Sequence, residues 1–228
     1  MNILVTGGTG ILGQEIQKLV EVYAPPRFVL NILDPIVPKC DLIVHCAAYT
    51  DVLRAESEKQ LCYETNVMGT RRLAIQGIPM IYISTEYIFD GEKGNYVEND
   101  FPNPTNFYAL TKLLGEYEAR RAPRSCVIRC LFKPRPFKHK NACVDQFTTG
   151  DYVDTIAKEI CIAISNFRLL PPTIHIGTER KSTYELARRT RSDVGRIGIK
   201  DVNGVTLPRD TSLNCTLWKD IKRELGHD

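Results

Sequence analysis

The chain begins MNILVTGGTGILG (residues 1–13), a short apolar run followed by glycine at positions 7, 8, 10 and 13. Glycine is the costliest residue to order, so this cluster indicates a backbone that turns tightly or approaches a ligand. The apolar run predicts a buried strand over residues 2–6, and the pattern beyond predicts a helix over residues 13–24. This order is typical of a dinucleotide-binding loop, with the diphosphate at the helix start. A P-loop is excluded because no Gly-Lys-Ser/Thr follows.

Strand and helix patterns alternate beyond this loop. Strands are predicted at 27–33, 41–48, 80–89, 125–132 and 172–177, and helices at 56–76, within 103–122, at 151–164 and within 182–191. The alternation predicts an α/β fold, a Rossmann-type doubly wound parallel sheet with helices on both faces. Few residues separate the second strand from the third, so this crossover is expected to be clipped or replaced by a loop.

We expect two structural units. A dinucleotide-binding Rossmann domain would comprise residues 1–132 and about 151–178, and a small C-terminal substrate-binding cap would comprise 133–150 and 179–228. The composition, with 43% hydrophobic and 25% charged residues, is that of an ordinary soluble protein. The eight cysteines contain no Cys-x-x-Cys pair, so reduced thiols are expected and no metal site is predicted. No membrane span or export signal is recognisable, and a cytoplasmic location is expected.

Asn31 lies where the second predicted strand should meet the adenosine ribose of a dinucleotide, and Asp34 is the other candidate. A carboxylate there would repel a 2′-phosphate, whereas Asn31 would not. NADP(H) is therefore expected ahead of NAD(H). The alternative interpretation is a polar residue that merely ends the strand.

Tyr108 and Lys112 stand four residues apart at the start of a predicted helix, which places them on one face. Of the ten tyrosines, Tyr108 alone has a lysine at this spacing. A nearby ammonium lowers the pKa of a phenol, and such a tyrosine can act as an acid. Ser84 and Thr85 end the fourth predicted strand, where a hydroxyl could hold a carbonyl group. The alternatives are a surface tyrosine with a solvated lysine, and a simple turn cap.

Five motifs then occur in a characteristic order: Gly7-x-x-Gly10-x-x-Gly13, HCAAYT (45–50), NVMGT (66–70), STEYIFDG (84–91) and YALTK (108–112). Together they resemble the extended short-chain dehydrogenases/reductases, and most of all the dTDP-4-dehydrorhamnose reductase family. The resemblance covers nearly all of residues 1–130 and thins beyond them. It implies NAD(P)H-dependent reduction of the C4 keto group of a nucleotide-linked 4-keto-6-deoxysugar, as in rhamnose biosynthesis.

The resemblance also implies residue roles. Tyr108 would protonate the substrate carbonyl oxygen, Lys112 would hold the nicotinamide ribose, and Thr85 would hydrogen-bond the carbonyl. The cofactor would be bound by Gly7, Thr9, Gly10, Ile11, Leu12, Gly13, Asn31, Ile32, Cys46, Ala47, Ala48, Tyr49, Asn66, Ser84, Tyr108 and Lys112. The sugar would be bound by Thr50, Thr85, Glu86, Tyr87 and Phe89.

The chain departs from the family at three positions: the family usually has Asp in place of Asn31, Asp in place of Glu86, and an acidic residue in place of Leu53. Ring epimerisation is not expected, because related epimerising enzymes have a cysteine where Ala55 precedes Glu56. A dehydratase would carry Asp-Glu after the Ser/Thr residue.

A non-catalytic, dinucleotide-binding regulatory subunit is the alternative from another functional class. The complete set of Thr85, Tyr108 and Lys112 argues against a regulatory subunit, and the shortened cap argues for it.

Most of the cationic excess lies in KPRPFKHK (133–140) and in residues 179–196. We expect Arg135 and Lys138 to bind the diphosphate of a nucleotide-sugar, with a solvated basic face as the alternative. Nucleic acid is not an expected partner, because the net charge is only +3 and no recognised module is present. By analogy with the family, a homodimer would form through the helices at 56–76 and 108–121.

Overall fold

The computed structural model describes residues 1–227; Asp228, the last residue of the predicted cap, lies outside the described residues. Its centre is a parallel sheet of five strands in the order β1 (Ile3–Thr6), β2 (Leu42–His45), β3 (Met80–Thr85), β4 (Ser125–Cys130) and β9 (Thr173–His175). The register pairs Thr6 with His45 and Thr85 with Cys130, so the carboxyl ends of these strands lie side by side at one end of the sheet. The candidate site lies at this end of the sheet.

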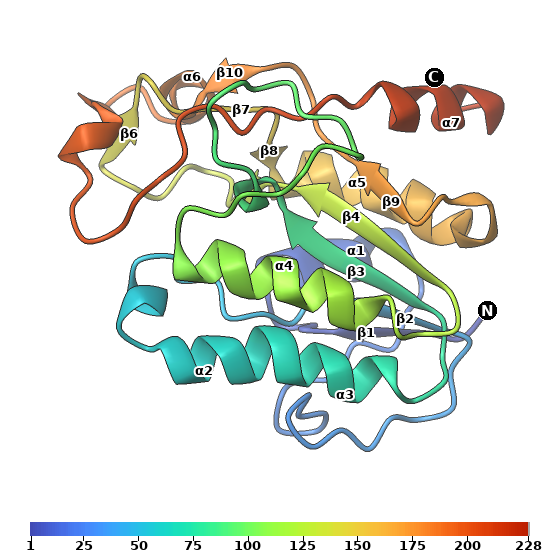
Figure 1. Ribbon diagram of the computed structural model, residues 1–228. Helices are drawn as coiled ribbons and strands as arrows, with labels where there is room; N and C mark the ends of the chain where they lie inside the picture. Colours follow the sequence, from blue (N-terminus) through green and yellow to red (C-terminus); the bar gives the residue numbers. More distant parts are fainter. Residues whose placement is uncertain (228) are drawn as a thin grey trace.

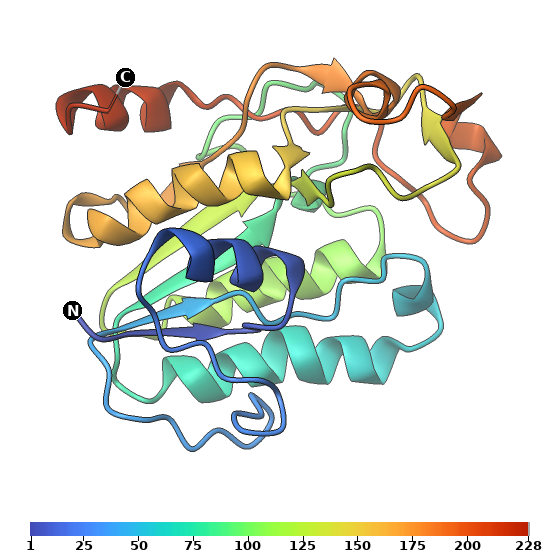
Figure 2. The ribbon, with the colours of Figure 1, turned by 180° about the vertical axis from the view of Figure 1, so that it is seen from behind.

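Helices cover both faces of the sheet, as Figures 1 and 2 show from opposite sides. One face carries α1 (Ile11–Leu19) and α5 (Val153–Ser165); the other carries α2 (Lys59–Tyr63), η2 (Glu64–Gly69), α3 (Thr70–Ala74) and α4 (Phe107–Ala119). Adjacent strand residues point to opposite faces, so Val5 packs in one core and Leu4 in the other. Burial on both sides explains the unbroken apolar runs in the strands. The predicted Rossmann-type α/β fold is confirmed.

The strand predicted at residues 27–33 is wrong. The sheet position beside β1 is taken instead by a single bridging residue, Tyr23, whose N–H donates to Ile3 O at 2.9 Å and whose carbonyl accepts from Val5 N at 2.8 Å. Two prolines follow at 25 and 26, and the chain then forms turns. Leu30 and Ile32 are nonetheless buried against the sheet, which accounts for the strand-like alternation.

Helix boundaries also differ from expectation. Helix α1 begins at Ile11 and ends at Leu19, because Val20 is already extended on the way to Tyr23. The helix predicted at 56–76 is present, but it begins at Lys59 and contains a π-helical turn, η2, in its middle. A C-terminal helix, α7 (Thr216–Glu224), was not predicted; its Trp218 is buried against the core.

Beyond the arrowheads of β3 and β4, the chain forms three small two-stranded sheets (Figure 1). They pair β5 (Phe132–Lys133) with β8 (Asp151–Tyr152), β6 (Asn141–Cys143) with β11 (Gly195–Ile197), and β7 (Phe147–Thr148) with β10 (Lys181–Ser182). Helix α6 (Thr183–Arg188) follows β10 directly. Short helices connect the remaining segments: η1 (Arg54–Glu56), η3 (Glu86–Ile88), η4 (Phe167–Leu169) and η5 (Ile199–Asp201).

In residues 1–227, no helix has both the length and the apolar character needed to cross a membrane. The same residues contain no group of three or more His, Cys, Asp or Glu side chains placed to hold a metal ion. All eight cysteines are free thiols, and six of them are buried: Cys62, Cys126, Cys130, Cys143, Cys161 and Cys215.

Candidate active site

A cavity of about 690 Å³ lies at the carboxyl ends of β1 to β4, the edge at which open α/β sheets bind ligands. Its walls are the glycine loop after β1, the segments that follow β2, β3 and β4, and the start of α4. Within the described chain, no Asp or Glu lines it, and its basic side chains are Arg27, Lys112, Lys133 and His139. The cavity therefore favours an anionic ligand.

Gly7 and Gly13 of the glycine loop have no room for side chains, because the loop backbone packs against itself and against the end of β2. Gly7 has a φ of +73°, and a Cβ atom there would lie 2.7 Å from the backbone nitrogen of Ala47. A Cβ atom on Gly13 would lie 2.4 Å from the carbonyl oxygen of Gly7. The N–H of Gly10 donates to that same oxygen at 2.9 Å and closes the turn at the start of α1. Side chains at these positions would displace the loop.

Most of the residues predicted to bind the cofactor line this cavity: Gly7, Thr9, Gly10, Ile11, Leu12, Gly13, Asn31, Ile32, Cys46, Ala47, Ala48, Ser84, Tyr108 and Lys112. Tyr49 and Asn66 do not. Asn66 is buried, and its side chain accepts from Tyr49 N at 2.8 Å and donates to Tyr49 O at 3.1 Å. This pair therefore holds the turn after β2 in place from behind the cavity wall.

Asn31 lines the cavity from an irregular segment rather than from a strand end. Its Oδ1 accepts from the N–H of Leu33 at 3.1 Å, so part of its polar capacity stabilises the local turn. The exposed Arg27, which the sequence reasoning missed, lines the same cavity. The signal for it is weak, because it is one basic residue after two prolines in a segment expected to be a strand.

Thr85, Tyr108 and Lys112 all line the cavity. Helix α4 begins after Asn106, whose side chain accepts from Ala109 N at 2.9 Å, and this cap fixes where Tyr108 and Lys112 emerge. The Lys112 ammonium donates to Ile83 O at 2.7 Å and lies 4.2 Å from the centre of the Tyr82 ring.

Burial determines the protonation of this set. It raises the pKa of Tyr108 above its ordinary value, and a hydrogen bond from Thr85 opposes the rise only in part. Burial dominates the pKa of Tyr108 in the protein alone, so the lowering expected from Lys112 does not prevail there. Burial also lowers the pKa of Lys112 to about 8, with Glu116 acting in the opposite direction. Tyr108 thus holds its proton at neutral pH, as a general acid requires.

Ser84 and Thr85 differ in what their hydroxyls do. Ser84 donates to Glu116 at 2.6 Å, and Glu116 forms a buried two-point ion pair with Arg129 at 2.9 and 3.0 Å. Thr85 accepts from Tyr87 N at 3.2 Å, as a cap of η3 would, and still lines the cavity. The capping and ligand-binding interpretations of Thr85 are therefore compatible.

The residues predicted to face the sugar separate into two groups. Thr50, Thr85 and Tyr87 line the cavity. Glu86 is fully buried outside the lining, where it accepts from the Thr211 hydroxyl at 2.7 Å and burial raises its pKa to about 7. Phe89 is also buried away from the cavity and stacks on Tyr96 with ring centres 4.2 Å apart.

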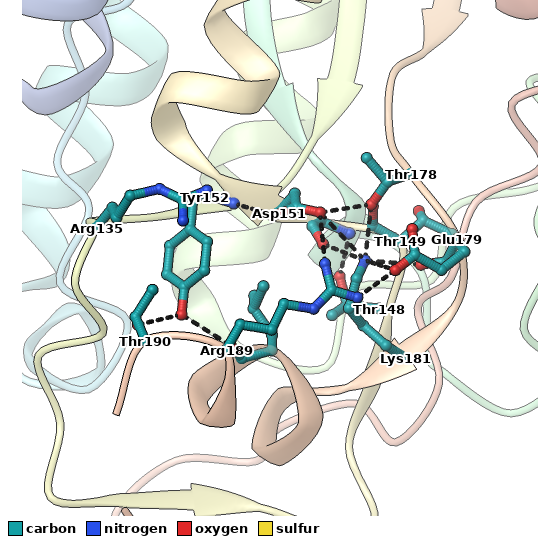
Figure 3. A network of polar contacts seen from close by, with 12 residues as sticks. Arg135, Thr148, Thr149, Asp151, Tyr152, Thr178, Glu179, Lys181, Arg189 and Thr190 are labelled. Carbon is teal, nitrogen blue, oxygen red and sulfur yellow. Dashed lines mark hydrogen bonds and ion pairs between the residues drawn. The ribbon is translucent and has the colours of Figure 1, made fainter. Parts of the chain in front are cut away.

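The basic residues predicted to bind a diphosphate lie elsewhere. Arg135 forms an ion pair with Asp154 at 2.9 Å and lies 4.2 Å from the centre of the Tyr152 ring (Figure 3). Lys138 is exposed and outside the lining. Two neighbours in the same stretch line the cavity instead, the half-buried Lys133 and the rim residue His139. The two predicted residues therefore do not line the cavity, although other residues of the same stretch do.

The cations of residues 179–196 are largely paired within the protein. Figure 3 shows Lys181 and Arg189 converging on the buried Asp151, at 3.7 and 3.2 Å, with Glu179 beside them. Lys181 also donates to Gly150 O at 2.8 Å and to the Thr178 hydroxyl at 2.7 Å. Arg180 and Arg191 pair with Asp210 and Asp193. This segment joins the small sheets together, and most of its cationic charges are compensated without a ligand.

The model of the RmlD substrate binding domain family matches residues 1–132, more than half of the chain. The chain belongs to this family. The RmlD-family portion contains the glycine loop, Thr85, Tyr108 and Lys112, and the resemblance expected from the motifs is confirmed.

The relatives of this RmlD-family chain are named either as a methionine adenosyltransferase subunit or as dTDP-4-dehydrorhamnose reductases. Methionine adenosyltransferase 2 subunit beta from Xenopus tropicalis is 30% identical over 231 residues, which cover 80% of this chain and 69% of that protein. A hypothetical dTDP-4-dehydrorhamnose reductase from Sulfolobus tokodaii is 29% identical, with a TM-score of 0.81 over 97% of this chain and 94% of that one. The Bacillus anthracis dTDP-4-dehydrorhamnose reductase, solved in complex with NADP, shares the fold with a TM-score of 0.81 at 22% identity; the match covers 100% of this chain and 94% of that one.

Proposed function

We propose that the protein reduces the C4 keto group of a nucleotide-linked 4-keto-6-deoxysugar to a hydroxyl group, using NADPH or NADH. One observation carries the proposal: Thr85, Tyr108 and Lys112 line the same cavity as the glycine loop. Membership in the RmlD family and the likeness to dTDP-4-dehydrorhamnose reductases support the same reaction.

The glycine loop fits a dinucleotide. Side chains at Gly7 or Gly13 would collide with backbone atoms at 2.4 to 2.7 Å, so the loop keeps its backbone open beside the start of α1. Free N–H groups and the positive end of the helix dipole there favour a diphosphate. A reduced nicotinamide bound in this cavity would supply a hydride to C4 of the sugar.

The side chains of the cavity complete the reduction. The Tyr108 hydroxyl gives its proton to the substrate oxygen as the hydride adds to carbon, and the phenolate is then reprotonated from water. The Thr85 hydroxyl holds the substrate oxygen in line. Lys112, fixed to Ile83 O, places a positive charge beside the phenol and lowers the energy of the phenolate that forms.

NADPH is the preferred cofactor in this proposal. Arg27 and Asn31 line the cavity together, and no carboxylate of residues 1–227 lines it with them. A guanidinium binds a phosphate with two hydrogen bonds, so Arg27 is suited to the 2′-phosphate that distinguishes NADPH. Asn31 carries no negative charge, so it would not repel that phosphate.

Lys133 and His139 are the proposed contacts for the diphosphate of the substrate. Lys133 forms no ion pair with the Asp and Glu residues of the described chain, in contrast to Arg135, Arg180 and Arg189. Glu86 acts on Lys133 at longer range and opposes the lowering of its pKa by burial. A half-buried ammonium in a cavity that no carboxylate of residues 1–227 lines is a favourable partner for an anion.

A second candidate function is a regulatory subunit that binds a dinucleotide without turnover. The observation that favours it is the 30% identity to methionine adenosyltransferase 2 subunit beta. The experiment that separates the two candidates is a panel of nucleotide 4-keto-6-deoxysugars, assayed by loss of NADPH absorbance alongside NADPH binding. Turnover of a panel member supports the reductase. Tight NADPH binding without turnover of any member supports the regulatory subunit.

A further inference from the structure

His45, the last residue of β2, lies behind the cavity wall and is almost fully buried. Each ring nitrogen meets a threonine hydroxyl: Nδ1 lies 2.7 Å from Thr6 Oγ1, and Nε2 lies 3.0 Å from Thr70 Oγ1. Thr6 directly precedes Gly7 of the glycine loop, and Thr70 begins α3. His45 therefore connects the cofactor side of the site to the helices of the opposite layer.

The direction of each hydrogen bond follows from counting protons. The Thr70 hydroxyl donates its one proton to Asn66 O at 2.7 Å, so it can only accept from the imidazole. Nε2 of His45 must then carry the ring proton, and Nδ1 accepts from the Thr6 hydroxyl. The Thr6 oxygen in turn accepts from Ala47 N at 3.3 Å. With a neutral imidazole, both ring nitrogens and both threonine hydroxyls have hydrogen-bond partners. Burial also favours the neutral form, because it lowers the pKa of His45 to about 3.

The hydrogen-bond chain continues to the backbone of Tyr108, whose side chain is the proposed acid. The side-chain amide of Asn66 holds Tyr49 and also donates to Thr111 Oγ1 at 3.0 Å. The Thr111 hydroxyl donates to the carbonyl oxygen of Tyr108 at 2.8 Å. Asn66 contributes its backbone oxygen to the His45 side of the chain and its side chain to the Tyr108 side.

A second route leads to the lysine. The rings of His45 and Tyr82 lie 5.6 Å apart, and the Lys112 ammonium lies 4.2 Å from the centre of the Tyr82 ring. The Tyr82 hydroxyl donates to the carbonyl oxygen of Lys112 at 3.3 Å. The two routes therefore connect His45 to the backbone of α4 at Tyr108 and at Lys112.

We infer that His45 is a positioning residue for the reduction: as a neutral imidazole protonated at Nε2, it fixes the glycine-loop side of the cavity relative to Tyr108 and Lys112. The inference rests on the proposed function for its catalytic meaning, and the hydrogen-bond chain itself stands on the structure. Misplacement of a reacting group by about 1 Å costs as much as roughly 10²-fold in rate, so the loss of His45 should produce a measurable fall in rate.

The test compares His45→Phe, which fills the space without polar atoms, with His45→Gln, whose amide can still donate to Thr70. For His45→Phe we expect kcat to fall about tenfold to a hundredfold, with the substrate KM and the NADPH Kd changed less than about threefold. His45→Gln should recover part of kcat. Thr70→Val is the second variant if His45→Phe does not fold, and Ser165→Ala is the control, because Ser165 makes the same kind of bond to Cys161 O away from the site.

Two measurements need no turnover. Nitrogen-15 spectra of the histidine rings should show His45 neutral and protonated at Nε2. The ring signals of Tyr108 should shift in His45→Phe or Thr70→Val and stay in place in Ser165→Ala. A charged or Nδ1-protonated His45, unmoved Tyr108 signals, or an unchanged kcat in His45→Phe would each overturn the inference. If the wild-type protein turns over no keto-sugar, the proposed function fails, and the spectra still decide the role of His45.

Discussion

The Lys112 ammonium is bound to the carbonyl oxygen of Ile83 at 2.7 Å, which ties helix α4 to the end of strand β3. This contact sets the position of the lysine before any ligand enters. It also explains why a lysine so deeply buried is tolerated: the Ile83 oxygen and the Tyr82 ring replace part of its water.

Lys112 should make stability depend on pH. The unfolded chain keeps this proton up to pH 10.5, whereas the folded protein releases it near pH 8. Between these values Lys112 binds more protons in the unfolded state, so this group by itself makes the free energy of unfolding rise with pH, against the fall that the raised pKa values of the buried cysteines cause. Lys112→Met should remove this rise, as urea unfolding across that range would reveal. Lys138→Met, at an exposed lysine, is the control. An unaltered pH slope in Lys112→Met would refute the prediction.

Gly7 and Gly77 form a matched pair for the glycine loop, because their φ angles are +73° and +74°. Gly77→Ala meets nothing within 4 Å and should cost only the left-handed conformation, about 1–2 kcal/mol. Gly7→Ala adds a collision with Ala47 N, so it should lose more stability and weaken NADPH binding by about tenfold or more. Thermal unfolding and fluorescence titration measure both effects. Equal NADPH Kd values in the two variants would argue against the loop as the cofactor site.

Arg27 should control the choice between the two cofactors. Arg27→Ala should weaken NADPH binding about tenfold by removing a charged hydrogen bond to the 2′-phosphate, and leave NADH binding nearly unchanged. Asn31→Asp should also weaken NADPH binding, because the new carboxylate would repel the 2′-phosphate. Parallel titrations with both cofactors test the pair. Equal losses for NADPH and NADH in Arg27→Ala would show that the arginine does not read the phosphate.

Lys133 and Lys138 separate the two assignments of the substrate diphosphate. Lys133→Ala should raise the substrate KM about tenfold, because its ammonium lines the cavity, while Lys138→Ala should leave KM unchanged. Arg135→Ala should affect stability instead, through Asp154. Steady-state kinetics with saturating NADPH measure these values. The reverse ranking of the two lysines would restore the original assignment.

Much of this architecture is readable from local sequence. The apolar runs around residues 2–6, 41–48 and 125–132 and the glycine spacing report on interactions within a few residues, so the sheet and its first loop were predictable. The segment 27–33 misled because Leu30 and Ile32 alternate as a strand would, while bridging at Tyr23 had already filled the sheet edge.

The site was predictable where spacing decides it and not where distant partners do. Tyr108 and Lys112 lie one helical turn apart, so their shared cavity follows from α4 alone. Arg135 was misassigned because its partner, Asp154, lies on a helix that follows it in the chain. His45 begins the HCAAYT motif, but the motif gave no signal for its role, because its two hydroxyl partners come from different elements.

The most direct test is the rate of NADPH oxidation with a nucleotide 4-keto-6-deoxysugar, measured for the wild-type protein and for Tyr108→Phe together with their NADPH Kd values. We predict turnover by the wild type and a loss of about 10²–10⁴ in kcat for Tyr108→Phe, with NADPH binding nearly intact. Full activity in Tyr108→Phe would contradict the account, and so would a wild type that binds NADPH and reduces no member of the substrate panel.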